Sequence, residues 1–155
     1  LLHFKGVKRR LELRGKVRDI MVFDDFAHHP SAIEATLTGV KARFPKNRIW
    51  AIFEPRSATS RRKVFQKQFS QCFSQADHVI LCSIFEPERL APNLQLNLEQ
   101  LVNDLRKEDC QVDCYSSANE IVEHVSPKLL PGDKVVIMSN GGFDNIHTKL
   151  LDALN

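Results

Sequence analysis

The segment Asp24–Ser31 holds side chains that could do chemistry, because two carboxylates and two imidazoles fall within six of its residues. Asp24 and Asp25 are adjacent in an extended stretch, so their side chains face opposite ways. One carboxylate can therefore enter a cleft and accept the hydroxyls of a ribose, while the other caps the helix that begins at Pro30 or pairs locally. His28 and His29 precede that helix. The alternative interpretation is a helix-entry loop with solvated histidines.

Two further chemistries are conceivable for these four side chains. A metal site is disfavoured, because ligands this close along a chain rarely surround one ion. A small phosphatase or hydrolase that uses Asp24 and the histidines is a weaker hypothesis, and no GxSxG elbow occurs in the sequence. Cys110 and Cys114 have no matching His or Cys pair elsewhere, so a zinc site is not expected either. We expect no metal ligand in this chain.

The segment 54–63 (EPRSATSRRK) is cationic at a predicted helix start. Arg61, Arg62 and Lys63 would fall in the first helical turn, where isolated cations are unfavourable by roughly 0.3–1 kcal/mol. A cationic loop at a helix N-terminus favours an anion such as a carboxylate or phosphate. Arg56 is the strongest single candidate, because it lies at the tip of the preceding strand. A solvated basic face is the alternative.

The segment Ser139–Phe143 (SNGGF) joins a buried strand to a helix. Its paired glycines, Gly141 and Gly142, permit positive φ and close backbone approach, so that exposed amides could form an anion-binding nest. The spacing matches neither the GxGxxG fingerprint nor the GxxxxGK[ST] phosphate loop. An ordinary tight turn between a strand and a helix is the alternative.

Hydrophobic periodicity predicts the elements that must position these segments. Residues 9–26 have the alternation of two short strands around a turn at Arg14–Lys16. Beyond Pro30, helices alternate with apolar strands to the end of the chain. The predicted helices span 30–44, 61–76, 94–107, 118–125 and 145–154. The predicted strands span 48–55, 77–85, 110–115 and 134–138.

This alternation indicates an α/β fold of the Rossmann-like type, with three layers in the order helix, sheet, helix. We expect a mainly parallel sheet of about six strands, with one antiparallel strand at its edge. Ligands of open α/β sheets bind at the carboxyl ends of the strands. Four segments of unusual composition fall at those ends and should converge there. They are 24–31, 54–60, 83–89 and 139–145.

Composition is that of one ordinary globular domain, with 155 residues, 43% hydrophobic and 26% charged. The net charge is +3 without a block of Lys and Arg, so neither a nucleic acid nor a membrane partner is expected. Free cysteines and the absence of a signal peptide favour the reducing cytoplasm. The chain begins at Leu1 without a cap or leader. We expect residues 1–8 to be the remnant of a linker and residues 9–155 to be one domain of a longer protein.

Four segments together resemble the C-terminal domain of bacterial Mur-type ligases, and the resemblance covers essentially the whole chain. They are GVKRRLELRG (6–15), FDDFAHHPSAIEATL (23–37), EPRSATS (54–60) and MSNGGFDNIHTKLL (138–151). The resemblance implies a parent enzyme with a UDP-sugar-binding domain, a central ATPase domain and this one. It further implies ATP and Mg²⁺, activation of a carboxylate as an acyl phosphate, and attack by an amine.

The resemblance implies the branch of this family that joins the tripeptide L-Ala-γ-D-Glu-meso-diaminopimelate to UDP-N-acetylmuramate during peptidoglycan recycling. By likeness, Asp25 contacts the ribose of ATP, with His28 and His29 near the nucleotide. A second set would line the peptide pocket: Arg56, Ser57, Arg61, Ser139, Asn140, Gly141, Gly142 and Phe143. The phosphate loop, magnesium ligands and modified lysine of the family belong to the central domain. We therefore expect no catalytic residue here and no activity from this fragment alone.

One competing hypothesis comes from a different class of protein. The chain would be a stand-alone Rossmann-like module that binds an anion or nucleotide without catalysis. A reading frame with roughly 300 further residues upstream, about two domains of ordinary size, that contain a glycine-rich phosphate loop would favour the ligase. A start codon just before Leu1 would favour the stand-alone module.

Overall fold

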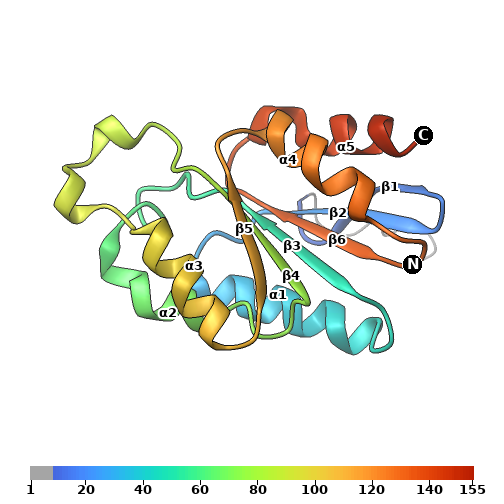
Figure 1. Cartoon of the computed structure of the whole chain (residues 1–155), viewed down its shortest axis with the longest axis horizontal. Coiled ribbons are helices and arrows are strands. Elements are labelled where there is room, and N and C mark those ends of the chain that lie inside the picture. The colour runs from blue at the N-terminus through green and yellow to red at the C-terminus, as the bar shows by residue number, and fades with distance from the viewer. Residues whose placement is uncertain (1–8) are drawn as a thin grey trace, which may run out of the picture.

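The computed structural model describes residues 9–155 and contains a six-stranded sheet in the order β1-β2-β6-β3-β4-β5 (Figure 1). The strands are β1 (Glu12–Val17), β2 (Ile20–Asp25), β3 (Ile49–Phe53), β4 (His78–Cys82), β5 (Gln111–Tyr115) and β6 (Lys134–Met138). The helices are α1 (Pro30–Arg43), α2 (Gln66–Gln71), α3 (Leu98–Lys107), α4 (Ala118–Val125) and α5 (Ile146–Leu154). Strand β1 pairs antiparallel with β2, and the other four pairings are parallel. The predicted fold class is confirmed, including the antiparallel edge strand. The predicted linker, residues 1–8, lies outside the described residues.

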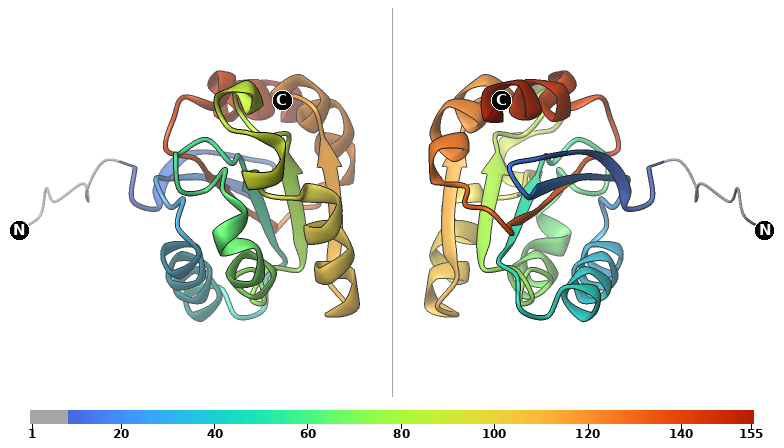
Figure 2. Two further views of the ribbon diagram at one scale, coloured as in Figure 1. Left: turned by 90° about the vertical axis from the view of Figure 1, so that its left-hand side faces the viewer. Right: turned by 90° about the vertical axis from the view of Figure 1, so that its right-hand side faces the viewer.

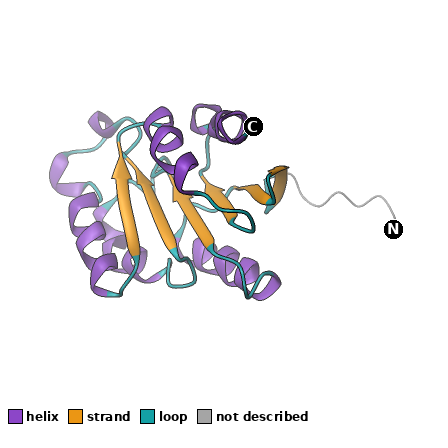
Figure 3. Cartoon of the chain, turned by 45° about the vertical axis from the view of Figure 1, so that its right-hand side comes forward, coloured by secondary structure: helices purple, strands orange, loops and turns teal. Residues whose placement is uncertain are grey.

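The core consists of two apolar layers, one on each face of the sheet (Figure 3). Along β3, Ala51 and Phe53 face the layer that contains residues of α1, α2 and α3, whereas Trp50 and Ile52 face the layer of α4 and α5. Successive strand residues point to opposite faces, and both faces are covered, so the interior strands are mostly apolar. This explains the continuous apolar runs at residues 49–53 of β3 and 135–138 of β6.

The edge hairpin turns at a different place from the one predicted. The turn lies at Arg18 and Asp19, both with positive φ (50° and 62°), and not at residues 14–16. Gly15 is instead inside β1, beside an irregularity of the pairing with β2. A Cβ at Gly15 would lie 2.8 Å from a methyl group of Leu151 on α5. The glycine therefore marks a close approach of helix and strand.

Two helices begin later than the periodicity predicts. Helix α2 starts at Gln66 after a single 3₁₀ turn, because Arg61 and Arg62 donate their backbone N–H groups to Ser57 and Thr59 in a preceding turn. Helix α3 starts at Leu98 because the Asn97 side chain accepts from the N–H of Gln100 at 2.9 Å and acts as N-cap. The predicted positions of α1, α4 and α5 are confirmed within one residue at each end.

The chain topology places two switch points beside β6. The loop after β6 leads to α5 on one face, whereas the loops after β2 and β3 lead to α1 and α2 on the other face (Figure 2). Strand β6 lies between β2 and β3. Where neighbouring strands send their connections to opposite faces, a crevice opens at their carboxyl ends. Asp24 of segment 24–31 and Gly141 of segment 139–145 line a cavity here, and Arg56 of segment 54–60 lies against Gly141.

At the opposite edge of the sheet, where the parallel strands begin, polar side chains cluster around Asp133. Its carboxylate accepts two hydrogen bonds from the Arg48 guanidinium, at 2.8 and 2.6 Å, and one from the Trp50 indole at 3.0 Å. The Trp50 ring stacks on His78, with centroids 3.9 Å apart and planes 7° from parallel. Burial lowers the pKa of His78, and the nearby Arg48 charge acts in the same direction.

Candidate functional site

Arg56 follows β3 and extends across the crevice toward the loop after β6. Its guanidinium lies over the Phe85 ring, 3.7 Å from the ring centroid. Its one ionic contact is with Glu54, at 3.9 Å, and among residues 9–155 it donates no hydrogen bond. About one third of the side chain is exposed. An arginine that is held by an aromatic face and has free N–H groups can take a carboxylate or phosphate.

Glu54 is a buried carboxylate at the carboxyl end of β3. It accepts a hydrogen bond from the Ser139 hydroxyl at 2.9 Å, which ties the end of β3 to the end of β6. Burial raises the pKa of Glu54, and the Ser139 hydrogen bond and the Arg56 charge only partly offset this. Sequence reasoning did not assign Glu54 a role, although it stands in the EPRS motif.

The glycines after β6 act differently from the prediction. Gly142 has φ −75°, and the positive φ values fall on Phe143, Asp144 and Asn145. Gly141 is required for another reason, because a Cβ there would overlap Nε and Cδ of Arg56. The close approach is therefore between the Gly141 backbone and the Arg56 side chain.

The side chains of this loop have different surroundings. Phe143 is buried against α5 and its neighbours. Asn140 has a buried Oδ1 without a hydrogen-bond donor among the described residues. Ser139 donates to Glu54 and accepts from the Gly141 N–H at 3.0 Å. The Asn140 Oδ1 is therefore buried without a donor, whereas Ser139 is bonded on both sides.

Ser57 and Arg61 are bonded within their own loop. The Ser57 hydroxyl binds Ser60 Oγ at 2.8 Å and accepts from the Ser60 N–H at 2.9 Å. The Arg61 guanidinium donates to the carbonyl oxygens of Phe85 and Glu86, at 3.2 and 3.3 Å. Arg61 therefore supports the loop that carries Phe85. The expectation that Arg61 stands in the first turn of a helix is wrong, because the turn at Ser57–Arg62 precedes that helix.

The three residues assigned to the nucleotide by likeness cluster at the start of α1. Asp25 is buried and accepts from the N–H groups of Leu11 and Ala27, both at 2.8 Å. His29 is the N-cap of α1, where its Nδ1 accepts from the Ser31 N–H at 3.2 Å. His28 Nδ1 lies 2.9 Å from the Phe26 carbonyl oxygen. These contacts are local, and the ribose and nucleotide assignments stay predictions.

Asp24, and not Asp25, lines a cavity of about 550 Å³ at the carboxyl end of β2. Its side chain contacts Arg9 at 3.1 Å and His147 of α5 at 3.1 Å. Burial by itself raises the pKa of Asp24, but the contacts with His147 and Arg9 outweigh burial and hold the pKa below its usual value. Sequence reasoning predicted that the two aspartates face opposite ways. It did not identify Arg9 and His147, because they are distant in the sequence from Asp24.

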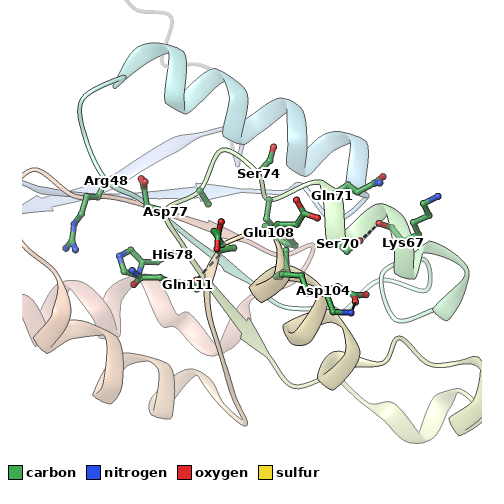
Figure 4. Close-up of a pocket in the computed structure, with 16 residues that line it drawn as sticks. Arg48, Lys67, Ser70, Gln71, Ser74, Asp77, His78, Asp104, Glu108 and Gln111 are labelled. Carbon is green, nitrogen blue, oxygen red and sulfur yellow. Dashed lines mark hydrogen bonds and ion pairs between the residues drawn. The ribbon is translucent and has the colours of Figure 1, made fainter.

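A larger cavity, of about 870 Å³, lies at the other edge of the sheet (Figure 4). It is lined by residues of α2 and α3 and by the amino ends of β4 and β5, with acidic and basic side chains mixed. Asp77 in its wall accepts from the Ile49 N–H at 2.7 Å. None of the predicted site residues lines it.

Metal-ligating side chains do not gather anywhere in residues 9–155 in groups of three or more. The two aspartates and two histidines of segment 24–29 bond separately, Asp24 to Arg9 and Asp25 to backbone N–H groups. No helix in this part of the chain has the length and apolar character needed to cross a membrane.

Comparison with known proteins identifies the family. A model of the family described as "Mur ligase, glutamate ligase domain" matches residues 9–141. The chain belongs to the Mur ligase family. The resemblance stated from the sequence is confirmed. The match begins at Arg9, the first described residue, and includes the crevice segments after β2, β3 and β4 and the start of the loop after β6.

Three relatives of this Mur ligase domain are informative. The "UDP-N-acetylmuramate--L-alanyl-gamma-D-glutamyl-meso-2,6-diaminoheptandioate ligase" of Haemophilus influenzae is 40% identical over 154 residues, which are 97% of this chain and 31% of the relative. A murein peptide ligase structure from Psychrobacter arcticus has a TM-score of 0.80 at 40% identity, over 98% of this chain and 31% of that one. A domain structure from a putative ligase of the same type from Haemophilus ducreyi has a TM-score of 0.74 at 32% identity, over 94% and 100%. The chain thus spans about a third of the full-length relatives.

Proposed function

We propose that this chain is the peptide-binding C-terminal domain of an ATP-dependent ligase. The ligase would join L-Ala-γ-D-Glu-meso-diaminopimelate to UDP-N-acetylmuramate. The proposal is supported by the 40% identity to the Haemophilus influenzae ligase, whose name contains both reactants. The remaining two thirds of such an enzyme would supply the UDP-sugar-binding and central ATPase domains.

The observation that carries the proposal is the free guanidinium of Arg56. Of the two arginines expected in the peptide pocket, Arg61 is bonded to carbonyl oxygens, whereas Arg56 rests on Phe85 with its N–H groups open to the crevice. The tripeptide carries several carboxylates. A planar guanidinium can hold one of them through two parallel hydrogen bonds, which lysine cannot reproduce.

The reaction itself would depend on groups outside this chain. The 155 residues contain no GxxxxGK[ST] loop, so the phosphates of ATP and Mg²⁺ would be held by the central domain. In that reaction ATP would phosphorylate the carboxylate of UDP-N-acetylmuramate and release ADP. The tripeptide amine would then attack the acyl phosphate, displace inorganic phosphate and form the amide. This chain would hold the peptide and contact the nucleoside end of ATP through Asp25, His28 and His29. The wider role would be peptidoglycan recycling in the bacterial cytoplasm.

The test is the steady-state kinetics of Arg56→Lys in the full-length ligase. Loss of a charge-assisted bidentate contact should raise the KM for the tripeptide by about tenfold or more, since such bonds contribute about 1.5–3 kcal/mol. The KM for ATP should stay the same. Equal effects on both substrates, or none, would show that Arg56 is structural. L-Alanine offered in place of the tripeptide checks the branch, because turnover with the single amino acid at the same efficiency would contradict the proposed acceptor.

A further inference from the structure

Arg9, the first described residue, is hydrogen-bonded to the loop after β6. Its Nη2 donates to the carbonyl oxygens of both Ser139 and Gly141, at 2.8 and 2.7 Å. Its Nε donates to Asp24 Oδ2 at 3.1 Å. One guanidinium therefore closes a turn of three residues in the loop and anchors that turn to the end of β2. All three partner residues are distant from Arg9 in the sequence, so these are long-range contacts.

The orientation of Arg9 is itself fixed. Asp24, its anchor, is 2% exposed, and its other oxygen lies 3.1 Å from His147 Nε2. The Arg9 guanidinium also lies over the Phe26 ring, 5.2 Å from the centroid. A buried carboxylate beneath the guanidinium and an aromatic ring beside it restrict the direction of the planar group. The two carbonyl oxygens are consequently held at a fixed place relative to β2.

The turn that Arg9 closes contains Gly141, and the Arg56 side chain lies directly against the backbone of Gly141. The space that a Cβ would fill at Gly141 is occupied by Nε and Cδ of Arg56. A displacement of Gly141 would therefore displace Arg56 or open a gap beside it. Because Arg9 and Arg56 both contact Gly141, the position of this residue couples one arginine to the other.

We propose that Arg9 is a positioning residue for peptide binding, which holds Gly141 through its carbonyl oxygen and thereby sets the place of Arg56. This inference rests on the proposed function, in which Arg56 binds a peptide carboxylate. Arg9 touches no substrate in this scheme. A role limited to stability would lower the melting temperature and leave the kinetic constants of the folded enzyme unchanged.

The experiment compares Arg9→Lys, Arg56→Lys and the double variant in the full-length ligase. Lysine keeps the charge, but a single ammonium cannot bond Asp24 and both carbonyl oxygens in the guanidinium geometry. Arg9→Lys should raise the KM for the tripeptide by about tenfold, the loss of one charge-assisted hydrogen bond, with kcat and the KM for ATP nearly unchanged. Arg14→Lys is the matched control. Arg14 also lies near Asp24, at 3.7 Å, but makes no hydrogen bond to the loop.

The double variant decides whether Arg9 acts through Arg56. If it does, adding Arg9→Lys to Arg56→Lys should change the tripeptide KM less than about twofold, because coupled residues are not additive. Additive effects, an unchanged KM in Arg9→Lys, or an equal effect of Arg14→Lys would overturn the positioning role alone. An unchanged tripeptide KM in Arg56→Lys would overturn the proposed peptide site, and the positioning role with it.

A second variant covers the case in which Arg9→Lys does not fold. Asp24→Asn removes the charge that orients Arg9 and should raise the same KM in the same direction, by a smaller factor. An Asp24→Asn ligase that folds and binds the tripeptide like the parent enzyme would contradict the proposal.

Discussion

Gly141 shows how one residue without a side chain can determine the position of another. The Arg56 side chain passes through the space that any Cβ at Gly141 would occupy. Glycine is conventionally explained by positive φ, but here the backbone of Gly141 needs none, and Phe143–Asn145 take the left-handed conformations instead. The requirement at Gly141 is therefore steric.

Gly141→Ala should displace Arg56 and raise the tripeptide KM of the full-length ligase by about tenfold, in line with the loss of a charge-assisted contact. Gly39→Ala is the control, because a Cβ at Gly39 meets no atom within 4 Å. In the interior of α1 the control should increase the free energy of unfolding by about 0.5–1 kcal/mol without changing the kinetics. Parent-like tripeptide kinetics in Gly141→Ala would contradict the steric account.

Asp24 links stability to pH at the residue scale. Its pKa is lowered in the folded chain by His147 and Arg9, so ionised Asp24 stabilises the fold above its unfolded pKa of about 3.9. This contribution is lost as the pH falls through the folded pKa. Asp24→Asn should cost about 1.5–3 kcal/mol at pH 7, and the difference from the parent chain should shrink below about pH 4. Urea unfolding at pH 7 and pH 3.5 measures both values, and a difference that is constant with pH would exclude this ion pair as the cause.

Single residues could be predicted only where the sequence places them by itself. Arg56 is expected at the tip of a strand, and the structure puts it there. The alternation of Asp24 and Asp25 also follows from an extended chain, but which of them lines a cavity depends on α5, which supplies His147. Arg61 donates to carbonyl oxygens of the 83–89 loop. These hydrogen bonds could not be predicted, because no periodic pattern in the sequence indicates the shape of that loop.

At the scale of elements, apolar periodicity identified every helix and strand, but local polar bonds moved some boundaries. Asn97 caps α3 and delays its start, and the Ser57–Ser60 hydrogen bonds form a turn where a helix was expected. The hairpin was misplaced because Gly15 looks like a turn residue, whereas Arg18 and Asp19 form the turn. Side-chain bonds to the backbone compete with regular structure, and periodicity does not register them.

His29 allows a test that separates capping from nucleotide binding in α1. Asparagine is a good N-cap, so His29→Asn should preserve the free energy of unfolding, whereas His29→Ala should lower it by about 0.5–2 kcal/mol. If His29 also contacts the nucleotide, both variants should raise the KM for ATP. Chemical denaturation and ATP kinetics of the two variants distinguish the roles. An ATP KM that is unchanged in both would remove His29 from the nucleotide site.

For the whole molecule, the sequence predicted the layers and the edge at which the loops after β2, β3 and β6 meet, because both follow from the alternation of strands and helices. Loops that leave parallel strands at their carboxyl ends must meet at one edge of the sheet. Strand order is harder, because the return of β6 between β2 and β3 is a long-range pairing without a local signal. That return creates the two switch points that bring Asp24, Arg56 and Gly141 to one crevice.

The isolated chain should fold cooperatively but have no ligase or ATPase activity. Its two apolar layers are complete without another domain, and the Haemophilus ducreyi domain that it matches was crystallised as a comparable unit. Part of a pocket gives few contacts, so ATP should bind no better than about millimolar. Thermal unfolding, phosphate release and calorimetry on residues 1–155 provide the test. Micromolar ATP affinity, or metal-dependent phosphate release by the pure chain, would mean that the chain is a complete enzyme.

The stack of Trp50 on His78 gives the molecule a built-in optical reporter. Trp50 is the single tryptophan of the chain, it is 2% exposed, and it lies at the amino-terminal edge of the sheet. Because burial keeps the pKa of His78 low, the imidazole against the indole is neutral at pH 7 and becomes a charged quencher only in more acidic solution. Indole emission therefore follows unfolding and acidification at this edge of the sheet, away from Arg56 and Gly141. Global stability can thus be recorded optically on an unlabelled sample, without interference from a change at the opposite edge.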